Sequence, residues 1–251
     1  MAAARTENIF ETVNHRRLLT NARLYLGLLL AHLGNIDMGE EKLRAALADA
    51  RQDGDMWTSG VATVQLAMTL VDAGNGWANE EASQLLRKLL ERPGDKDFRG
   101  FANAILANIH LDRGQLDAAE SHIRLALDML ITFVTARPYA DAARLRILLR
   151  SNRIDEAHDD AEEALSRLDR LVGGGFAEVR LRLAAFEAYA AAGDPSAERI
   201  LEGALDQISI RAGTIDDPVA RATFLAKNPI NRSALEEGGK RFPITAPACK
   251  F

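Results

Sequence analysis

The chain has 251 residues, of which 47% are hydrophobic and 6% aromatic, and its formal net charge is −5. Apolar content made mostly of Ala and Leu predicts packed helices with enough apolar surface for a sizeable core. The negative charge argues against a nucleic acid as partner, and no apolar stretch reaches the roughly 20 residues of a membrane span. With a single cysteine, Cys249, and no basic and apolar leader at its start, the sequence favours a cytoplasmic location.

Residues 1–20 carry a helical pattern with one apolar side. Ile9, Phe10, Val13 and Leu18 recur along that side. We expect this segment to be an N-terminal extension that lengthens the first helix or caps one end of the array of repeats that follows it.

Residues 21–208 repeat one pattern: an amphipathic run, a turn residue, and a second amphipathic run. Glycine, and asparagine after it, best tolerates the left-handed conformation that ends a helix. One hairpin of this kind cannot bury its apolar faces, so the hairpins must stack, and the pattern predicts a single-domain, all-α solenoid of about five antiparallel hairpins. The turn residues, which recur about every 40 residues, are Gly34, Gly74, Gly114, Asn152 and Gly193.

Two residue pairs also recur. The first run contains Leu followed by a small residue, at Leu26-Gly27, Leu66-Ala67 and Leu106-Ala107. The second run contains Ala-Leu, at Ala46-Leu47, Ala126-Leu127 and Ala164-Leu165. In both respects residues 21–208 resemble the tetratricopeptide-repeat family, with the longer period of its long-helix members. The resemblance implies a non-catalytic scaffold or adaptor that binds a peptide or a partner helix in its concave groove.

The C-terminal part predicts capping helices. Asp217 followed by Pro218 is typical of a helix start. A further helix is expected over 229–237, ended by Gly238-Gly239. The expected organisation is an extension at 1–20, repeats at 21–208, capping helices at 209–240 and a flexible tail at 241–251.

The string DPVARATFLAKNPINRSAL, residues 217–235, carries a second resemblance. It is similar to the closing segment of repeat regions attached to large bacterial signalling proteins, such as serine/threonine kinases and ATPase-type regulators. This resemblance implies a stand-alone relative of a sensor or scaffold region, active in bacterial signalling or assembly.

Residues 155–158 read DEAH, the nucleotide-hydrolysis box of a helicase family. That chemistry needs a phosphate-binding loop, G-x-x-x-x-G-K-[ST]. The sole Gly-Lys pair, Gly239-Lys240, is followed by Arg241, and Ala234 stands where the first glycine should be. We therefore interpret the string as the start of a second helix of the fourth hairpin, with its carboxylates at the helix N-terminus and His158 facing water.

The remaining chemistry gives no sign of an enzyme. The five histidines are scattered, and neither a metal-binding spacing nor a nucleophile motif occurs, so we expect no metal and no cofactor. In a stacked array the first helix of each hairpin lines the concave face, where a partner would bind. The candidate groove residues are Asn21, His32, Gln65, Met68, Asp72, Asn108, Asp112, Arg146, Arg150, Arg180 and Glu187.

Five arginines follow one another closely in the fourth repeat. They could form a site for an anion or an acidic peptide, because guanidinium groups bind carboxylates bidentately. Alternatively, they line a solvated helix edge and pair with the acid-rich run 155–163. The arginines are Arg137, Arg144, Arg146, Arg150 and Arg153.

Three classes of function remain as hypotheses. A scaffold that binds another protein or peptide should show an open groove or an exposed apolar patch. A regulator that encloses a small molecule should show a deep pocket with convergent polar groups. An enzyme would require titratable groups clustered in a cleft, and His32, Asp72 and Asp112 within hydrogen-bonding reach would support that class. We expect the first class, without nucleic acid or membrane span, and a homodimer is possible.

Overall fold

A computed structural model describes residues 15–74, 76–91, 94–131, 135–171 and 175–242. These residues form twelve helices and no strands, which confirms the all-α class. No described helix is long and apolar enough to cross a membrane. Most of the expected N-terminal extension and of the C-terminal tail lies outside the described residues.

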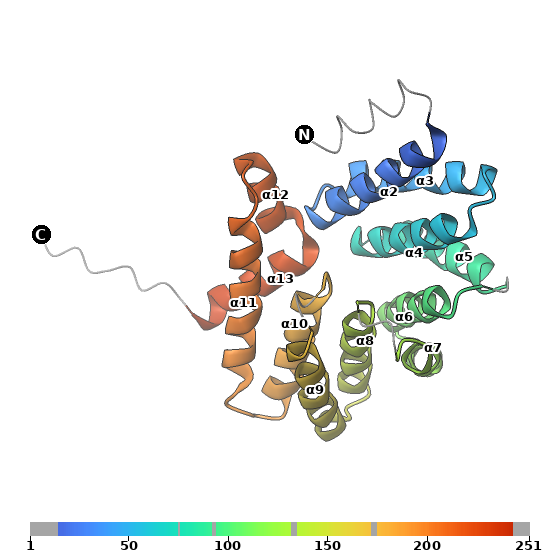
Figure 1. The fold of residues 1–251 in the computed structure, drawn as a ribbon. Helices are drawn as coiled ribbons and strands as arrows, with labels where there is room; N and C mark the ends of the chain where they lie inside the picture. Colours follow the sequence, from blue (N-terminus) through green and yellow to red (C-terminus); the bar gives the residue numbers. More distant parts are fainter. Residues whose placement is uncertain (1–14, 75, 92–93, 132–134, 172–174, 243–251) are drawn as a thin grey trace, which may run out of the picture.

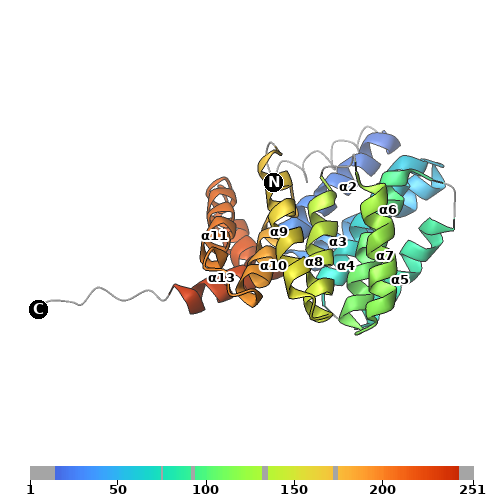
Figure 2. The ribbon, with the colours of Figure 1, turned by 90° about the horizontal axis from the view of Figure 1, so that it is seen from below.

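Five antiparallel hairpins follow one another round an arc (Figure 1). The inner helices are α2 (Arg16–His32), α4 (Met56–Asp72), α6 (Lys96–Asp112), α8 (Arg137–Arg150) and α10 (Glu178–Ala191). The outer helices are α3 (Ile36–Gln52), α5 (Gly76–Leu90), α7 (Leu116–Met129), α9 (Ile154–Asp169) and α11 (Ala197–Gly213). Seen from below, the hairpins stand side by side from α11 at one side to α5 at the other (Figure 2).

The residues predicted to turn the chain do so. All five have positive φ, between 56° at Asn152 and 86° at Gly34. At these points the chain reverses from an inner helix into an outer one. The predicted period of the array is therefore confirmed at each of its hairpins.

Small residues let the inner helices pack on both sides. In α6 the residues from Gly100 to Ile109 are all buried, because α7 covers one side and the neighbouring inner helices cover the other. In the first hairpin Gly27 fits against α3, where a Cβ would lie 2.8 Å from Leu43 Cγ. Burial of this kind contributes about 25 cal/mol per Å² of apolar surface and makes the stacked array stable.

The last two helices, α12 (Pro218–Lys227) and α13 (Pro229–Arg241), bring the end of the array back to its beginning (Figure 1). The Asn228 amide donates to the carbonyl oxygen of His32 at 2.9 Å. A Cβ on Gly34 would lie 2.6 Å from the backbone nitrogen of Asn228. Leu33 packs against the apolar cluster around Phe224. The C-terminal helices thus close the array on the first hairpin.

The C-terminal prediction is confirmed at its start and wrong at its end. Asp217 caps α12 by accepting from Val219 N at 2.8 Å. Gly238-Gly239 do not end the last helix, since α13 continues to Arg241. Gly238 instead permits close packing on α11, because a Cβ there would lie 2.7 Å from a Leu205 methyl group.

Candidate functional site

The DEAH string begins an outer helix, as predicted. The helix α9 starts at Ile154, and Asp155 and Glu156 lie in its first turn. His158, however, does not simply face water: its Nε2 lies 3.0 Å from an Asp194 carboxylate oxygen, and its ring packs on Tyr189 at 4.3 Å. The fifth hairpin supplies both contacts, so His158 joins two repeats.

Charged residues on the inner helices meet across the array. Arg180 donates to Asp72 at 2.6 Å, although 108 residues separate them. Arg146 donates to Asn108 at 3.2 Å and to Asp112 at 3.4 Å. We call these five residues, together with His32 and Tyr139, the inner cluster. Its cations and carboxylates compensate each other.

Aromatic rings lie beside the charges of the inner cluster. The Arg180 guanidinium lies 5.0 Å from the centre of the Tyr139 ring. Tyr139 is 0% exposed, and its hydroxyl has no hydrogen-bond partner among the described residues. Burial raises the pKa of this hydroxyl to about 12, so Tyr139 stays neutral at physiological pH.

His32 stacks on Phe176, with ring centres 5.5 Å apart. Burial is the main cause that lowers the pKa of its imidazole below the ordinary value. Asp72 and Asp112 are bonded to arginines, and His32 Nε2 has no partner within the described ranges. Within the described residues, His32, Asp72 and Asp112 are therefore not hydrogen-bonded to one another.

The other predicted groove residues have mixed positions. Met68 is 4% exposed and belongs to the core, so it cannot contact a partner. Asn21 and Gln65 are half-buried, whereas Arg150 and Glu187 are exposed at the C-terminal ends of α8 and α10.

The arginine cluster of the fourth repeat is largely paired, as the second of its two interpretations predicts. Arg144 bonds Glu156 at 2.8 Å and Asp160 at 2.5 Å. Arg153 bonds Glu120 at 2.7 Å. Only Arg150, within the described part of the chain, makes no ion pair among the five. The Arg144 pairs join the two helices of the fourth hairpin, and the Arg153 pair joins this hairpin to the third. Together the pairs leave little charge for an anion.

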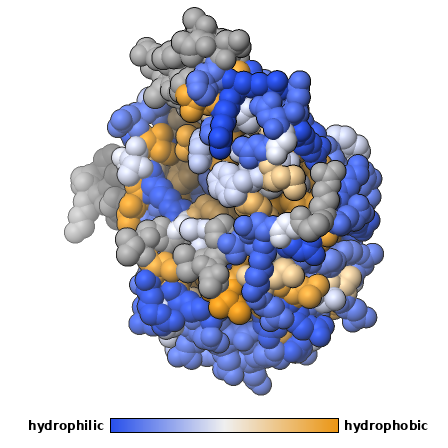
Figure 3. Space-filling model, turned by 45° about the vertical axis from the view of Figure 1, so that its right-hand side comes forward, coloured by the Kyte–Doolittle hydropathy of each residue, from blue (hydrophilic) through white to orange (hydrophobic). Residues whose placement is uncertain are grey.

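A groove that the sequence analysis did not identify lies between the first three hairpins. We call it the side groove; its volume is about 710 Å³. In the space-filling view, apolar side chains show in a hollow on this face, and hydrophilic residues surround it (Figure 3). The groove is lined by Arg51, Met56, Trp57, Ser59, Gly60, Thr63, Leu85, Lys88, Leu89, Glu91, Gly94, Asp95, Phe98 and Arg99.

The starts of α4 and α6 form one wall of the side groove. Asp55 caps α4 by accepting from Thr58 N at 3.0 Å, which places Met56 and Trp57 in the first turn. Phe98 of α6 lies against Gly60 of α4, where a Cβ would be 2.6 Å from the Phe98 ring. Since Gly60 has no side chain, the Phe98 and Trp57 rings meet edge to face, with centres 6.2 Å apart.

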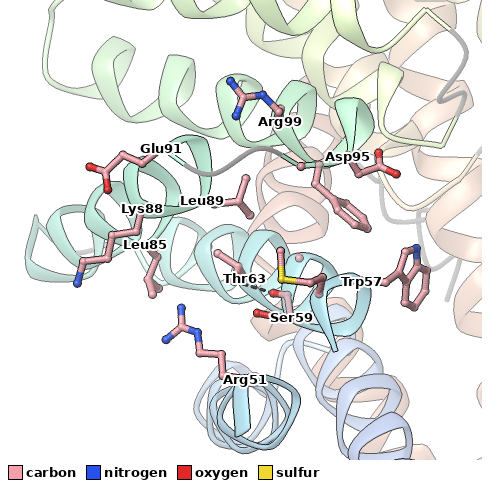
Figure 4. A pocket seen from close by; sticks show the side chains of 14 residues that line it. Arg51, Trp57, Ser59, Thr63, Leu85, Lys88, Leu89, Glu91, Asp95 and Arg99 are labelled. Atoms are coloured by element: carbon pink, nitrogen blue, oxygen red, sulfur yellow. Dashed lines mark hydrogen bonds between the residues drawn. The ribbon is translucent and has the colours of Figure 1, made fainter. Parts of the chain in front are cut away.

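The side groove exposes apolar and cationic groups together. Met56 is 65% exposed and Trp57 56% exposed. Arg51 and Lys88, at the ends of α3 and α5, are exposed and make no ion pair within the part of the chain that is described. Figure 4 shows both cations on the side of the groove away from Trp57.

One signal in the sequence could have revealed this groove. Met56 and Trp57 are consecutive large apolar residues directly after the helix cap Asp55. Two large apolar side chains that leave a first turn about 100° apart cover a wide sector of the helix end. Such a pair indicates that apolar surface lies at the start of this helix.

Comparison with known proteins gives no match to a family model or to a curated protein. Among the residues that the structure describes, no three His, Cys, Asp or Glu side chains lie together in a way that could hold a metal ion. The fold and these two surfaces are therefore the basis for a functional proposal.

Proposed function

We propose that this protein is a non-catalytic interaction module, similar to tetratricopeptide-repeat proteins, that binds a segment of another protein in its side groove. The observation that carries the proposal is an open groove in which Met56 and Trp57 are more than half exposed. Tryptophan and methionine are enriched at protein interfaces and contribute much of their binding energy. An open groove with exposed anchors is what a scaffold needs.

The side groove supports this function better than the concave face. On the concave face most charged candidates are bonded to one another, so a partner would first have to break the Asp72–Arg180 and Asp112–Arg146 pairs. Breaking a partly buried pair leaves a charge without compensation and costs free energy. In the side groove, burying Met56 and Trp57 breaks no pair.

The proposal also includes the cellular role of the protein. The similarity of residues 217–235 to bacterial repeat regions supports a role in cytoplasmic signalling or assembly in bacteria. A second copy of the chain is one possible partner, and the mass of the captured protein would reveal it.

The test is affinity capture from the native cell extract with the immobilised full chain. Trp57→Ala should lose the captured protein, because the substitution removes the aromatic anchor of the groove. Removal of such an anchor often costs about 2 kcal/mol or more of binding free energy, or roughly thirtyfold in affinity. Trp77→Ala is the matched control, since Trp77 is 70% exposed and lies outside the groove. Equal capture by both variants would contradict the proposal.

A ligand-sensing regulator is the second candidate. It is favoured by the Tyr139 hydroxyl and His32 Nε2, two buried polar atoms without partners among the described residues. Buried polar groups are normally hydrogen-bonded, so a small polar molecule could satisfy them. A metabolite fraction that raises the Tm of the wild type but not of Tyr139→Phe would favour this class.

A further inference from the structure

The charges of the side groove are not balanced. Arg51 and Lys88 reach it from α3 and α5 and have no acidic partner among the described residues. Arg99 and Asp95 line the groove as well. Arg99 donates to the Leu90 carbonyl oxygen at 2.7 Å, and the Asp95 carboxylate caps α6 by accepting from Asp97 N at 2.8 Å. Glu91 is exposed, and in the view of Figure 4 Lys88 lies between it and Arg51. One side of the groove therefore presents two cations to a ligand.

Apolar side chains occupy the space between these cations and Trp57. Leu85 and Leu89 of α5 line the groove together with Phe98 of α6. Figure 4 shows the two leucines on the same side of the groove as Lys88. A ligand that contacts Trp57 and also reaches the cations must cross this apolar surface. It must therefore have one apolar face, with acidic groups along one edge of that face.

The backbone of the ligand also has to be satisfied. The described residues contain no strand, so the groove offers no sheet edge to which an extended peptide could add. Backbone groups buried against Leu85 and Leu89 without hydrogen-bond partners would weaken the binding of such a peptide. A helix satisfies its own backbone groups, and the apolar side of an amphipathic helix suits a groove between helices.

We propose that the side groove binds an acidic amphipathic helix of a partner protein. Its apolar face packs on Met56, Trp57 and Phe98, and its glutamates or aspartates pair with Arg51 and Lys88. This inference rests on the proposed function and specifies the partner's chemistry.

The test uses two synthetic helical peptides, each about four turns long, with the same Leu and Phe residues at i, i+3, i+4 and i+7. One carries glutamates along the edge of the apolar face and the other carries lysines. The receptor is the full chain with Trp77→Phe, so that the fluorescence of Trp57 reports binding directly. The acidic peptide should bind at least about tenfold more tightly, and added salt should reduce the difference.

Charge reversal provides the decisive arm. Arg51→Glu with Lys88→Glu should invert the preference, so that the lysine peptide binds more tightly. Arg124→Glu with Arg199→Glu is the matched control, because it changes the net charge equally at exposed residues outside the groove.

Each outcome has a distinct meaning. Inversion in the groove variant, with the wild-type preference kept in the control, supports the proposal. Equal affinity of both peptides for the wild type overturns the acidic partner and leaves a groove that binds peptides. Binding of neither peptide overturns the helical partner, and unchanged capture by Trp57→Ala from cell extract would separately remove the proposed function.

Discussion

At the scale of single residues, the local role of a residue could be predicted and its distant partner could not. The turn at Asn152 follows from its tolerance of positive φ, which depends only on local backbone geometry. The bond of Asp72 to Arg180 joins residues 108 positions apart, and its existence depends on the curvature of the whole array. Sequence periodicity contains no information about that curvature, so the candidate groove residues could be placed on helices but not paired.

His32 makes a prediction about pH. Burial lowers its pKa, so between the lowered value and the ordinary value of about 6.5 the unfolded state binds more protons than the folded state. Stability therefore rises with pH in this window and is lost as the pH falls through it. The substitution His32→Phe should keep an aromatic ring against Phe176 and remove the group that binds the proton.

The measurement is the free energy of unfolding in urea at several pH values. As the pH falls below about 6.5, the wild type should lose stability relative to His32→Phe. Burial also lowers the pKa of His122, but His122 is present in both proteins and cancels from the difference. A difference that does not vary with pH would show that His32 is not a desolvated neutral imidazole.

At the scale of helices and turns, periodicity and capping predicted most elements. The cap at Asp217 and the start of α9 lie where the sequence places them. The predicted end of α13 was wrong because a glycine can have either of two roles in a helical protein. It can end a helix, or it can let two helices approach closely. Gly238 has the second role, and only its contact with Leu205 on α11 distinguishes the two.

Gly34 and Gly74 form a matched pair that tests the closure of the array. Both have positive φ, so alanine at either position should cost about 1–2 kcal/mol for the backbone alone. A Cβ at Gly74 meets no atom within 4 Å, whereas at Gly34 it would lie 2.6 Å from Asn228 N and 2.8 Å from the Lys227 carbonyl carbon.

Gly34→Ala should therefore cost about 1–3 kcal/mol more than Gly74→Ala, because it pushes α12 and α13 away from the first hairpin. Urea unfolding of the two variants measures the difference. Equal losses would mean that the first and last helices are not in contact in solution.

At the scale of the whole molecule, the order of the helices was predictable and the surfaces were not. An array of hairpins with a period of about 40 residues must stack, and it does. Two features depend on small rotations between repeats. They are the closure of the array through Asn228 and the groove between the first three hairpins. On the concave face the charged residues pair with one another, whereas the side groove has cations without an ion pair among the described residues. We therefore expect a partner to bind in the side groove and not on the concave face.

The most direct test of this account is photo-crosslinking in the native cell with a photoreactive phenylalanine analogue at one of three positions. Position 57 probes the side groove, position 150 probes the concave face, and position 77 is the exposed control. We predict a discrete crosslinked partner from position 57, formed through one short segment of that partner, and none from 77 or 150. A partner crosslinked from position 150 and not from 57 would contradict the account and return the binding surface to the concave face.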